Sequence, residues 1–371
     1  MTSRHLRQLL LVILCTLLGI GVVAVYSASA MASQATYGGS LRFVASHLLA
    51  IASGLVLGLG CLRVPFIRLR RSARWWMVLS LVLLVLVNLF GQEVGGARRW
   101  FHLGRWSLQP SELAQLALVL YVADLLARNV DHLNEFWRGV APSLAVTGAM
   151  AGLVLLQPDL GTAIAMGSVS LLLLGVAKAR WQHLAAIVAV AAVVLVVLVA
   201  GAEYRRRRML AFLNPWQDPR GSGYQILQSY FALGSGGLFG LGVGASLQKL
   251  FYLPSAHTDF IFAIIGEELG LVGTTAVLGL FALFLTCGLR IAMACHDLFS
   301  KYLICGLVGM IGLEAAINIG VVTGLLPTKG LPLPFISYGG TSMVMNLVAC
   351  ALIFQASRYG ERFHLQGALG R

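Results

Sequence analysis

Long apolar runs separated by short polar segments fill most of the chain. They are about 20 residues long, the length that a helix needs to cross a bilayer, and they lack the period-two alternation of membrane-barrel strands. We therefore predict an all-α, polytopic membrane protein with ten spans, forming one domain over residues 1–371. The expected spans cover residues 9–26, 42–62, 75–91, 111–128, 138–156, 160–177, 181–201, 259–287, 302–326 and 339–357.

Lys and Arg residues divide unevenly between the two sides that ten spans define. With the N-terminus inside, 16 of them lie in cytoplasmic segments and 11 lie outside. The positive-inside rule then places both termini in the cytoplasm. The longest connection, about residues 203–258 between the seventh and eighth spans, falls outside. Within it, Ile226, Leu227, Tyr230 and Phe231 have helical spacing, which predicts a short amphipathic helix on the membrane.

Composition agrees with the pattern, since 58% of the residues are hydrophobic and 11% are charged. A soluble domain carries about 25% charged residues. The net charge of +13 would suit nucleic acid, but the distribution of charge across a membrane explains it, and we expect no nucleic-acid partner. The six cysteines have no ligand spacing and are interpreted as packing residues.

An aspartate stands at the mouth of the eighth span, in His257-Thr258-Asp259-Phe260. A charge at membrane depth costs at least about 2.5 kcal/mol, which makes such a residue a functional candidate. Glu267 and Glu268 follow in the same predicted helix, roughly 12 Å deeper at 1.5 Å per residue. Only one of them can share the face of Asp259, and which one faces a cavity stays open. Helix capping by Asp259 is the structural alternative.

Further polar clusters fall on the same outer side. They contain Arg99, Glu112, Asp159, Lys329 and Ser337. Glu112 also fits the first turn of a helix capped by Ser111, and Asp159 fits a helix start. Within the ninth span, Glu314 and Asn318 are either partners of each other or interhelical hydrogen bonders.

Outer cations form a second group of candidates. The run from Arg205 to Arg208 is either a collar on lipid headgroups or a diphosphate-binding element, for which forked guanidinium donors are suited. A candidate anion-binding rim consists of Lys249 and Lys329 together with Arg98, Arg99 and Arg105.

Short polar motifs stand at the ends of the predicted spans and in the connections: YSAS at 26–29, GARRW at 96–100, QPSEL at 109–113, QPDLGT at 157–162, NPWQDP at 214–219, GSGYQ at 221–225, HTDFIFAIIGEELG at 257–270, LPTKG at 326–330 and SYGGTS at 337–342. In this order they resemble the SEDS (shape, elongation, division and sporulation) family over nearly all ten spans. The similarity is closer to the FtsW and SpoVE branch than to the RodA branch.

The resemblance implies a glycosyltransferase of the bacterial cytoplasmic membrane that polymerises lipid II into peptidoglycan at the outer face. It also implies a class B penicillin-binding protein as transpeptidase partner, and other division or elongation proteins. Asp259 matches the essential catalytic residue of the family. Arg99, Glu112, Asp159 and Lys249 match other positions of its cavity. The chain departs from the family at Gln115, where a lysine is usual.

Two mechanisms are open for this chemistry. Asp259 takes a proton from the attacking sugar hydroxyl, or it holds a divalent cation, Mg²⁺ or Mn²⁺, that shares this task. We include His257, Glu267, Lys329 and Ser337 among the substrate-binding candidates. The rival functions are a lipid II transporter, which ten spans with buried acids would also suit, and a division scaffold without chemistry.

Overall fold

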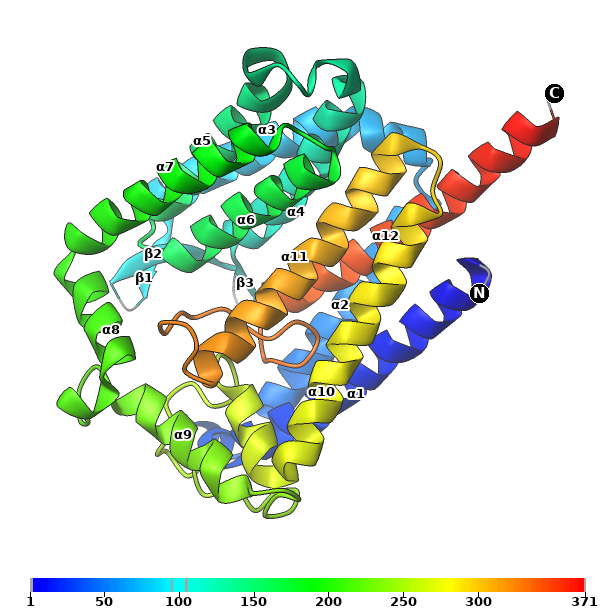
Figure 1. The fold of residues 1–371 in the computed structure, drawn as a ribbon. Coiled ribbons are helices and arrows are strands. Elements are labelled where there is room, and N and C mark those ends of the chain that lie inside the picture. The colour runs from blue at the N-terminus through cyan, green and yellow to red at the C-terminus, as the bar shows by residue number, and fades with distance from the viewer. Residues whose placement is uncertain (1–2, 95, 104–105, 370–371) are drawn as a thin grey trace.

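The computed structural model describes residues 3–94, 96–103 and 106–369, and its helices form one elongated bundle (Figure 1). Within these residues, nine helices are long and apolar enough to cross a membrane, and α6, with 17 residues, is a shorter apolar helix. The multi-pass prediction is confirmed. The helices are α1 (Ser3–Tyr37), α2 (Arg42–Arg63), α3 (Phe66–Phe90), α4 (Pro110–Arg128), α5 (Ala141–Leu155), α6 (Leu160–Val176), α7 (Trp181–Ala200), α10 (Ile261–Met293), α11 (Leu298–Val322) and α12 (Gly340–Leu369).

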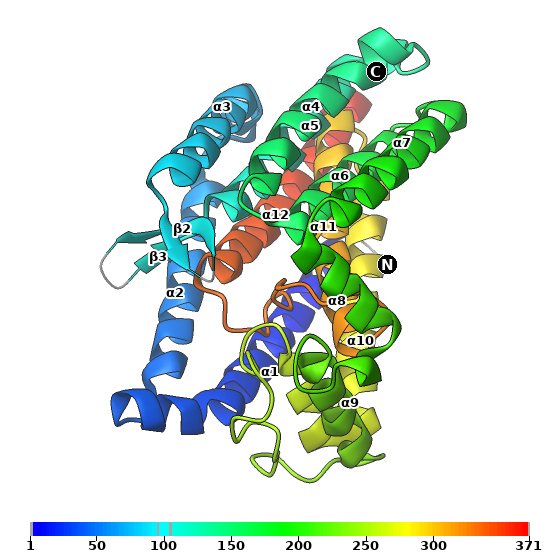
Figure 2. The same cartoon turned by 90° about the vertical axis from the view of Figure 1, so that its left-hand side faces the viewer.

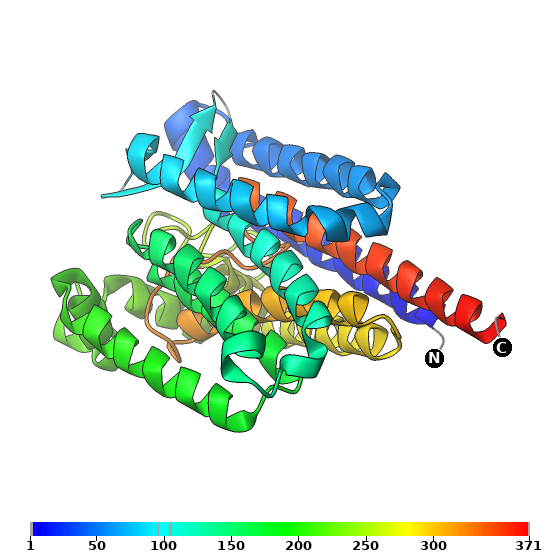
Figure 3. The same cartoon turned by 90° about the horizontal axis from the view of Figure 1, so that it is seen from above.

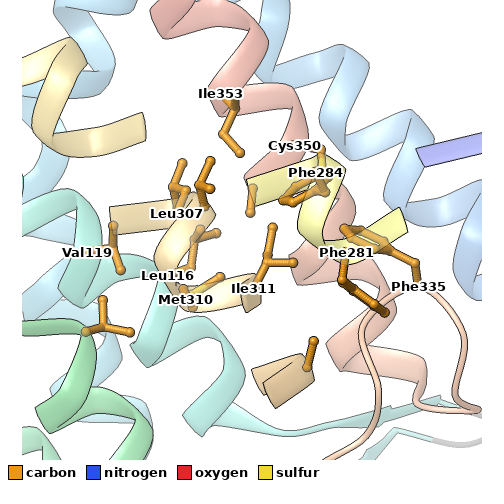
Figure 4. Packing of buried hydrophobic residues seen from close by; sticks show 14 of the residues in the cluster. Leu116, Val119, Phe281, Phe284, Leu307, Met310, Ile311, Phe335, Cys350 and Ile353 are labelled. Atoms are coloured by element: carbon orange, nitrogen blue, oxygen red, sulfur yellow. The ribbon is translucent and has the colours of Figure 1, made fainter. Parts of the chain in front are cut away.

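Helices α4, α11 and α12 are mostly buried and form the centre of the bundle. By contrast, α7 has no buried residue and lies at the edge, where Figure 3 shows it in green. The core joins residues of α4, α10, α11 and α12 with Phe335 of the connection before α12 (Figure 4). This buried centre carries the connections that form the site described below.

Two shorter helices, α8 (Glu203–Leu213) and α9 (Tyr224–Gly236), lie in the connection between α7 and α10. We call the end of the bundle that they occupy the loop end. Helix α1 begins and α12 ends at the opposite end (Figure 1). The amphipathic helix expected around Ile226 is confirmed as α9, whereas α8, which carries the arginine run, was not predicted.

A small antiparallel sheet between α3 and α4 departs from the all-α prediction. Its strands are β1 (Gln92–Val94), β2 (Ala97–Leu103) and β3 (Trp106–Leu108), with β2 in the middle. Gly96 has a φ of 77°, which glycine adopts without steric cost. Thr341, at the start of α12, donates to the Ser107 carbonyl at 2.8 Å, so the sheet is held beside α12 (Figure 2).

A break divides α10 at Gly270, whose φ of 66° and ψ of −160° are not helical. Residues 261–269 form a short helix at the loop end, and the span proper starts at Leu271. The expectation that Glu267 and Glu268 lie deeper in the span than Asp259 is therefore wrong. Both glutamates precede the break and bind groups of the α9–α10 connection.

Several span boundaries also differ from the prediction. Helix α3 begins at Phe66 and not at residue 75, because the arginines of its first two turns continue the helix beyond the apolar run. Helix α11 runs from Leu298 to Val322, about four residues earlier than expected. All six cysteines are free. Four of them are buried, as expected of packing residues, whereas Cys61 is half-buried and Cys15 is exposed and does not fit this interpretation.

Candidate active site

A small pocket, partly open to the surroundings, lies at the loop end between four separate segments. Its wall comes from β2, the α5–α6 turn, the end of α7 with α8, and the α11–α12 connection. The lining residues are Arg99, Pro158, Asp159, Leu160, Gly161, Val199, Tyr204, Arg205, Arg208, Met209, Pro327, Thr328, Lys329 and Gly330. Four cations and one carboxylate among them make the wall positively charged, which suits an anionic ligand.

Asp259 lies against this wall, just before α10. A Cβ atom on Gly330 would come within 2.9 Å of Asp259 Oδ2, so the absence of a side chain at Gly330 lets the carboxylate approach the pocket. Burial raises the pKa of Asp259 to about 6, although Arg208 and Arg99 act in the opposite direction. The group is therefore mostly ionised at pH 7 and close enough to neutrality to accept a proton.

The backbone around Asp259 is fixed by hydrogen bonds from two elements. Asn318 of α11 donates to the Asp259 carbonyl at 2.8 Å and to the Leu331 carbonyl at 2.7 Å. The Ser337 hydroxyl donates to the Thr258 carbonyl at 2.6 Å and accepts from the Leu333 amide. Ser337 thus joins the α11–α12 connection to the Asp259 segment and does not line the pocket. Sequence reasoning missed this role of Asn318.

Arg99 and Asp159 shape the turn between α5 and α6. Arg99 Nε donates to the Gln157 carbonyl at 2.8 Å, and Nη2 donates to the Pro158 carbonyl at 2.6 Å. Asp159 is the N-cap of α6, as one reading of the sequence predicted, and accepts from the Thr162 amide and hydroxyl. Both side chains line the pocket while they hold its wall in place.

The arginine run divides by position on α8. Arg205 and Arg208, three residues apart on one face, line the pocket, whereas Arg206 and Arg207 do not. Arg205 donates to the Tyr204 hydroxyl and to the Leu198 carbonyl. Arg207 pairs with Glu203. Within the described part of the chain, the Arg208 side chain has no hydrogen-bond partner or ion pair, so its guanidinium donors are available.

Lys329 completes the cationic wall beside Asp159. A Cβ atom on Gly161 would lie 3.3 Å from Lys329 Cδ and 3.6 Å from Asp159 Oδ1, which places both side chains around this glycine. Burial lowers the pKa of Lys329 to about 8, and the Asp159 charge opposes the shift. Lys329 is still largely charged at pH 7.

Glu112 lies behind the wall, in the first turn of α4. The cap of this helix is Gln109, with Pro110 at the first helical position, so the predicted Ser111 cap is wrong. Glu112 is buried and close enough to Asp159 and Glu314 for their charges to interact. It therefore connects the pocket with a polar network inside the bundle.

Glu314 is at the centre of this network. It accepts from Gln115 Nε2 at 2.8 Å and from Asn346 Nδ2 at 3.4 Å. Gln115 thus gives Glu314 a neutral donor. The sequence left open whether Glu314 and Asn318 pair with each other or bond to other segments. Both bond to other segments, and they are not bonded to each other.

Besides Glu112 and Ser337, three more of the predicted substrate-binding residues do not line the pocket: Lys249, His257 and Glu267. Lys249 Nζ pairs with Glu268 at 3.1 Å, and Glu267 binds the backbone of residues 247 and 248. The His257 ring packs against Phe43 and Tyr338, and burial lowers its pKa. Lys249 is thus paired with Glu268, whereas Lys329 lines the pocket. Arg98 pairs with Glu93, and Arg105 lies outside the described residues.

A metal ion in the pocket would need suitable side-chain ligands. In the described ranges, no three His, Cys, Asp or Glu side chains are grouped to hold a metal ion. Mg²⁺, however, usually keeps several waters and binds one or two carboxylates together with substrate phosphates. Asp259 and Asp159 fit that smaller role for a cation that arrives with a diphosphate. Such a cation would neutralise phosphate charge.

Comparison with known proteins decides the family. The profile of the FtsW/RodA/SpoVE family, described as "Cell cycle protein", matches residues 7–362. The chain belongs to this family. It is 41% identical over 355 residues to Stage V sporulation protein E of Bacillus subtilis (strain 168), covering 95% of this chain and 97% of the relative. It is 40% identical over 339 residues to the probable peptidoglycan glycosyltransferase FtsW of Geobacter metallireducens, covering 91% and 90%.

Solved structures of the family have the same fold. A chain from work on "Structural coordination of polymerization and crosslinking by a peptidoglycan synthase complex" matches with a TM-score of 0.80 and 31% identity, covering 95% of this chain and 97% of that one. The rod shape determining protein RodA of Thermus thermophilus matches with a TM-score of 0.70 and 30% identity, covering 95% and 96%. This confirms the predicted SEDS fold.

Proposed function

We propose that this protein is a peptidoglycan glycosyltransferase that polymerises lipid II, with Asp259 as its general base. The observation that carries this assignment is a half-buried carboxylate with a pKa of about 6 beside a wall of four cations. The relatives described as probable peptidoglycan glycosyltransferases support the reaction class.

We assign the cationic wall to binding of the glycosyl donor, the lipid-linked glycan whose diphosphate leaves. Arg208 and Lys329 present charged donors to the diphosphate that links one glycan to its lipid, while Arg99 and Arg205 hold the wall. As the bond between the anomeric carbon and the diphosphate breaks, its electron pair leaves with the diphosphate. Cations placed where this charge develops stabilise the transition state.

We assign Asp259 to the glycosyl acceptor, the molecule whose hydroxyl attacks. The 4-hydroxyl of a second lipid-linked disaccharide attacks the anomeric carbon from the face opposite the diphosphate, and its proton passes to Asp259. One C–O bond forms and one breaks, with inversion at the carbon. No second carboxylate is required as an acid, because the diphosphate leaves as an anion.

The arrangement in the membrane follows from this reaction. We place the loop end outside the cell and both termini in the cytoplasm, where the arginines between residues 63 and 74 also lie. The product needs crosslinking, so a class B penicillin-binding protein is the partner that we assign. The synthase complex that contains a chain of the same fold supports this pairing.

Polymerisation is expected to have a bell-shaped pH profile. Protonation of Asp259 removes the base below pH 6, with a loss of about tenfold per pH unit. Deprotonation of Lys329 removes a cation above pH 8. The measurement is the rate of glycan formation from purified lipid II between pH 5 and 9. Lys329→Arg keeps the positive charge at high pH, so the decrease in rate above pH 8 should disappear. If the decrease remains, another group causes it.

A comparison of Arg208 and Arg206 variants distinguishes diphosphate binding from a general attraction to lipid headgroups. Arg208→Gln should lower kcat/KM about 10- to 150-fold, since a hydrogen bond to a charged group contributes about 1.5–3 kcal/mol. Arg206→Gln, on the same helix but outside the pocket, should have little effect. Equal losses in both variants would favour the headgroup collar.

A further inference from the structure

Residues 237–252, which we call the apolar loop, expose large hydrophobic side chains at the loop end. Phe239 is 82% exposed, and Leu238, Val243, Leu247 and Phe251 are each at least 60% exposed. An exposed apolar patch of this kind marks an interaction surface. The chemistry of the segment and its position against α10 identify the partner.

The apolar loop contains one charged residue, Lys249. From Gly221 to Gln248 the sequence has no Asp, Glu, Lys or Arg. The cation that follows, Lys249, has its Nζ 3.1 Å from a Glu268 carboxylate oxygen and bonds to the Gly244 carbonyl as well. Only 9% of the Lys249 side chain and 6% of the Glu268 side chain are exposed, so the pair presents little charge to the surroundings.

Hydrogen bonds attach the apolar loop to α10 on both sides of the break at Gly270. Leu241 N donates to the Glu267 carbonyl at 3.0 Å, and Val272 N donates to the Leu238 carbonyl at 3.2 Å. Leu271 and Val272, the first residues of the span, are themselves more than half exposed. The exposed apolar surface of the membrane span therefore continues into the loop without interruption.

Glu267 satisfies polar groups that water would satisfy on an aqueous surface. Its carboxylate accepts from the Leu247 amide at 3.0 Å, from the Gln248 amide at 3.3 Å and from the Ser246 hydroxyl. In hydrocarbon, each backbone group needs a partner within the protein. These contacts give two amides of the loop a partner within the protein, as a lipid environment requires.

We propose that the apolar loop inserts into the bilayer and contacts lipid acyl chains at the loop end. The segment expected to be an outer loop thus has two parts. Helix α8 carries the arginines of the pocket, while residues 237–252 extend the lipid-facing surface of α10. Glu267 and Glu268 stabilise the inserted segment from its protein side.

Spin labels distinguish lipid from water directly. Phe239→Cys and Leu247→Cys are labelled with a nitroxide in full-length protein in which Cys15 and Cys61, the two cysteines that are not buried, are replaced by alanine. The protein is reconstituted in phosphatidylglycerol and phosphatidylethanolamine vesicles. Collision of each label with oxygen, which concentrates in hydrocarbon, is compared with collision with a water-soluble nickel chelate.

Two control positions set the scale. Val193→Cys lies on the exposed surface of α7, and Arg220→Cys lies in the exposed polar part of the α8–α9 connection. We expect both loop labels to match Val193, with high oxygen and low nickel collision. Values like those of Arg220 would overturn the proposal. Low collision with both reagents would also overturn it, because the surface would then be covered by protein.

Discussion

Asp259→Asn should lower kcat for glycan polymerisation by about 10²- to 10⁴-fold, the usual contribution of a positioned general base. Asparagine has nearly the same shape, so the hydrogen bonds from Asn318 and Ser337 to the surrounding backbone should persist. The amide cannot take the proton from the sugar hydroxyl. The rate is measured with purified lipid II, and binding of substrate is measured separately.

Glu203→Gln is the matched control for this experiment. Glu203 is an exposed acid at the start of α8, paired with Arg207 and outside the pocket. It should retain the full rate. A loss in Asp259→Asn that appears in KM alone, with kcat unchanged, would mean that Asp259 binds substrate without transferring a proton.

Lys249→Met should destabilise the protein by about 3–5 kcal/mol, because it leaves Glu268 as a buried charge without its cation. Lys249, Ser27 of α1 and Glu268 meet at one point, so the loss should loosen the α9–α10 connection from α1. Thermal unfolding in detergent measures the effect.

A second substitution tests the cause. In Lys249→Met combined with Glu268→Gln, the uncompensated charge is gone, and most of the stability should return. Arg207→Met breaks the exposed pair with Glu203 and should cost less than about 1 kcal/mol. If the double variant is no more stable than Lys249→Met, the ion pair is not what holds this connection.

Local patterns predicted much of the fold. Apolar runs of span length predicted the helices, and the spacing from Ile226 to Phe231 predicted α9. Asp159 after Pro158 indicated a helix start, and its side chain indeed caps α6. The break at Gly270 was missed because the apolar run continues through it, and glycine is common inside membrane helices. The sheet was missed because its short strands are specified by their pairing.

The site was predicted less completely, because it is assembled from distant segments. Motifs identified Arg99, Asp159, Asp259 and Lys329, and these residues lie around one pocket. Lys249 and Glu267 were equally good candidates from the sequence. In the structure, however, their side chains form contacts that stabilise the apolar loop. The three-residue spacing of Arg205 and Arg208 was a usable signal, since it puts both on one face of a helix.

The most direct test of the proposed function uses the protein with its transpeptidase partner in sealed vesicles that carry lipid II only in the leaflet at the loop end. Penicillin blocks crosslinking, and glycan products are separated by length. The account predicts glycan strands from this leaflet, with release of the lipid diphosphate and without movement of lipid II to the other leaflet. Movement of lipid II without strand formation would contradict it and identify a transporter.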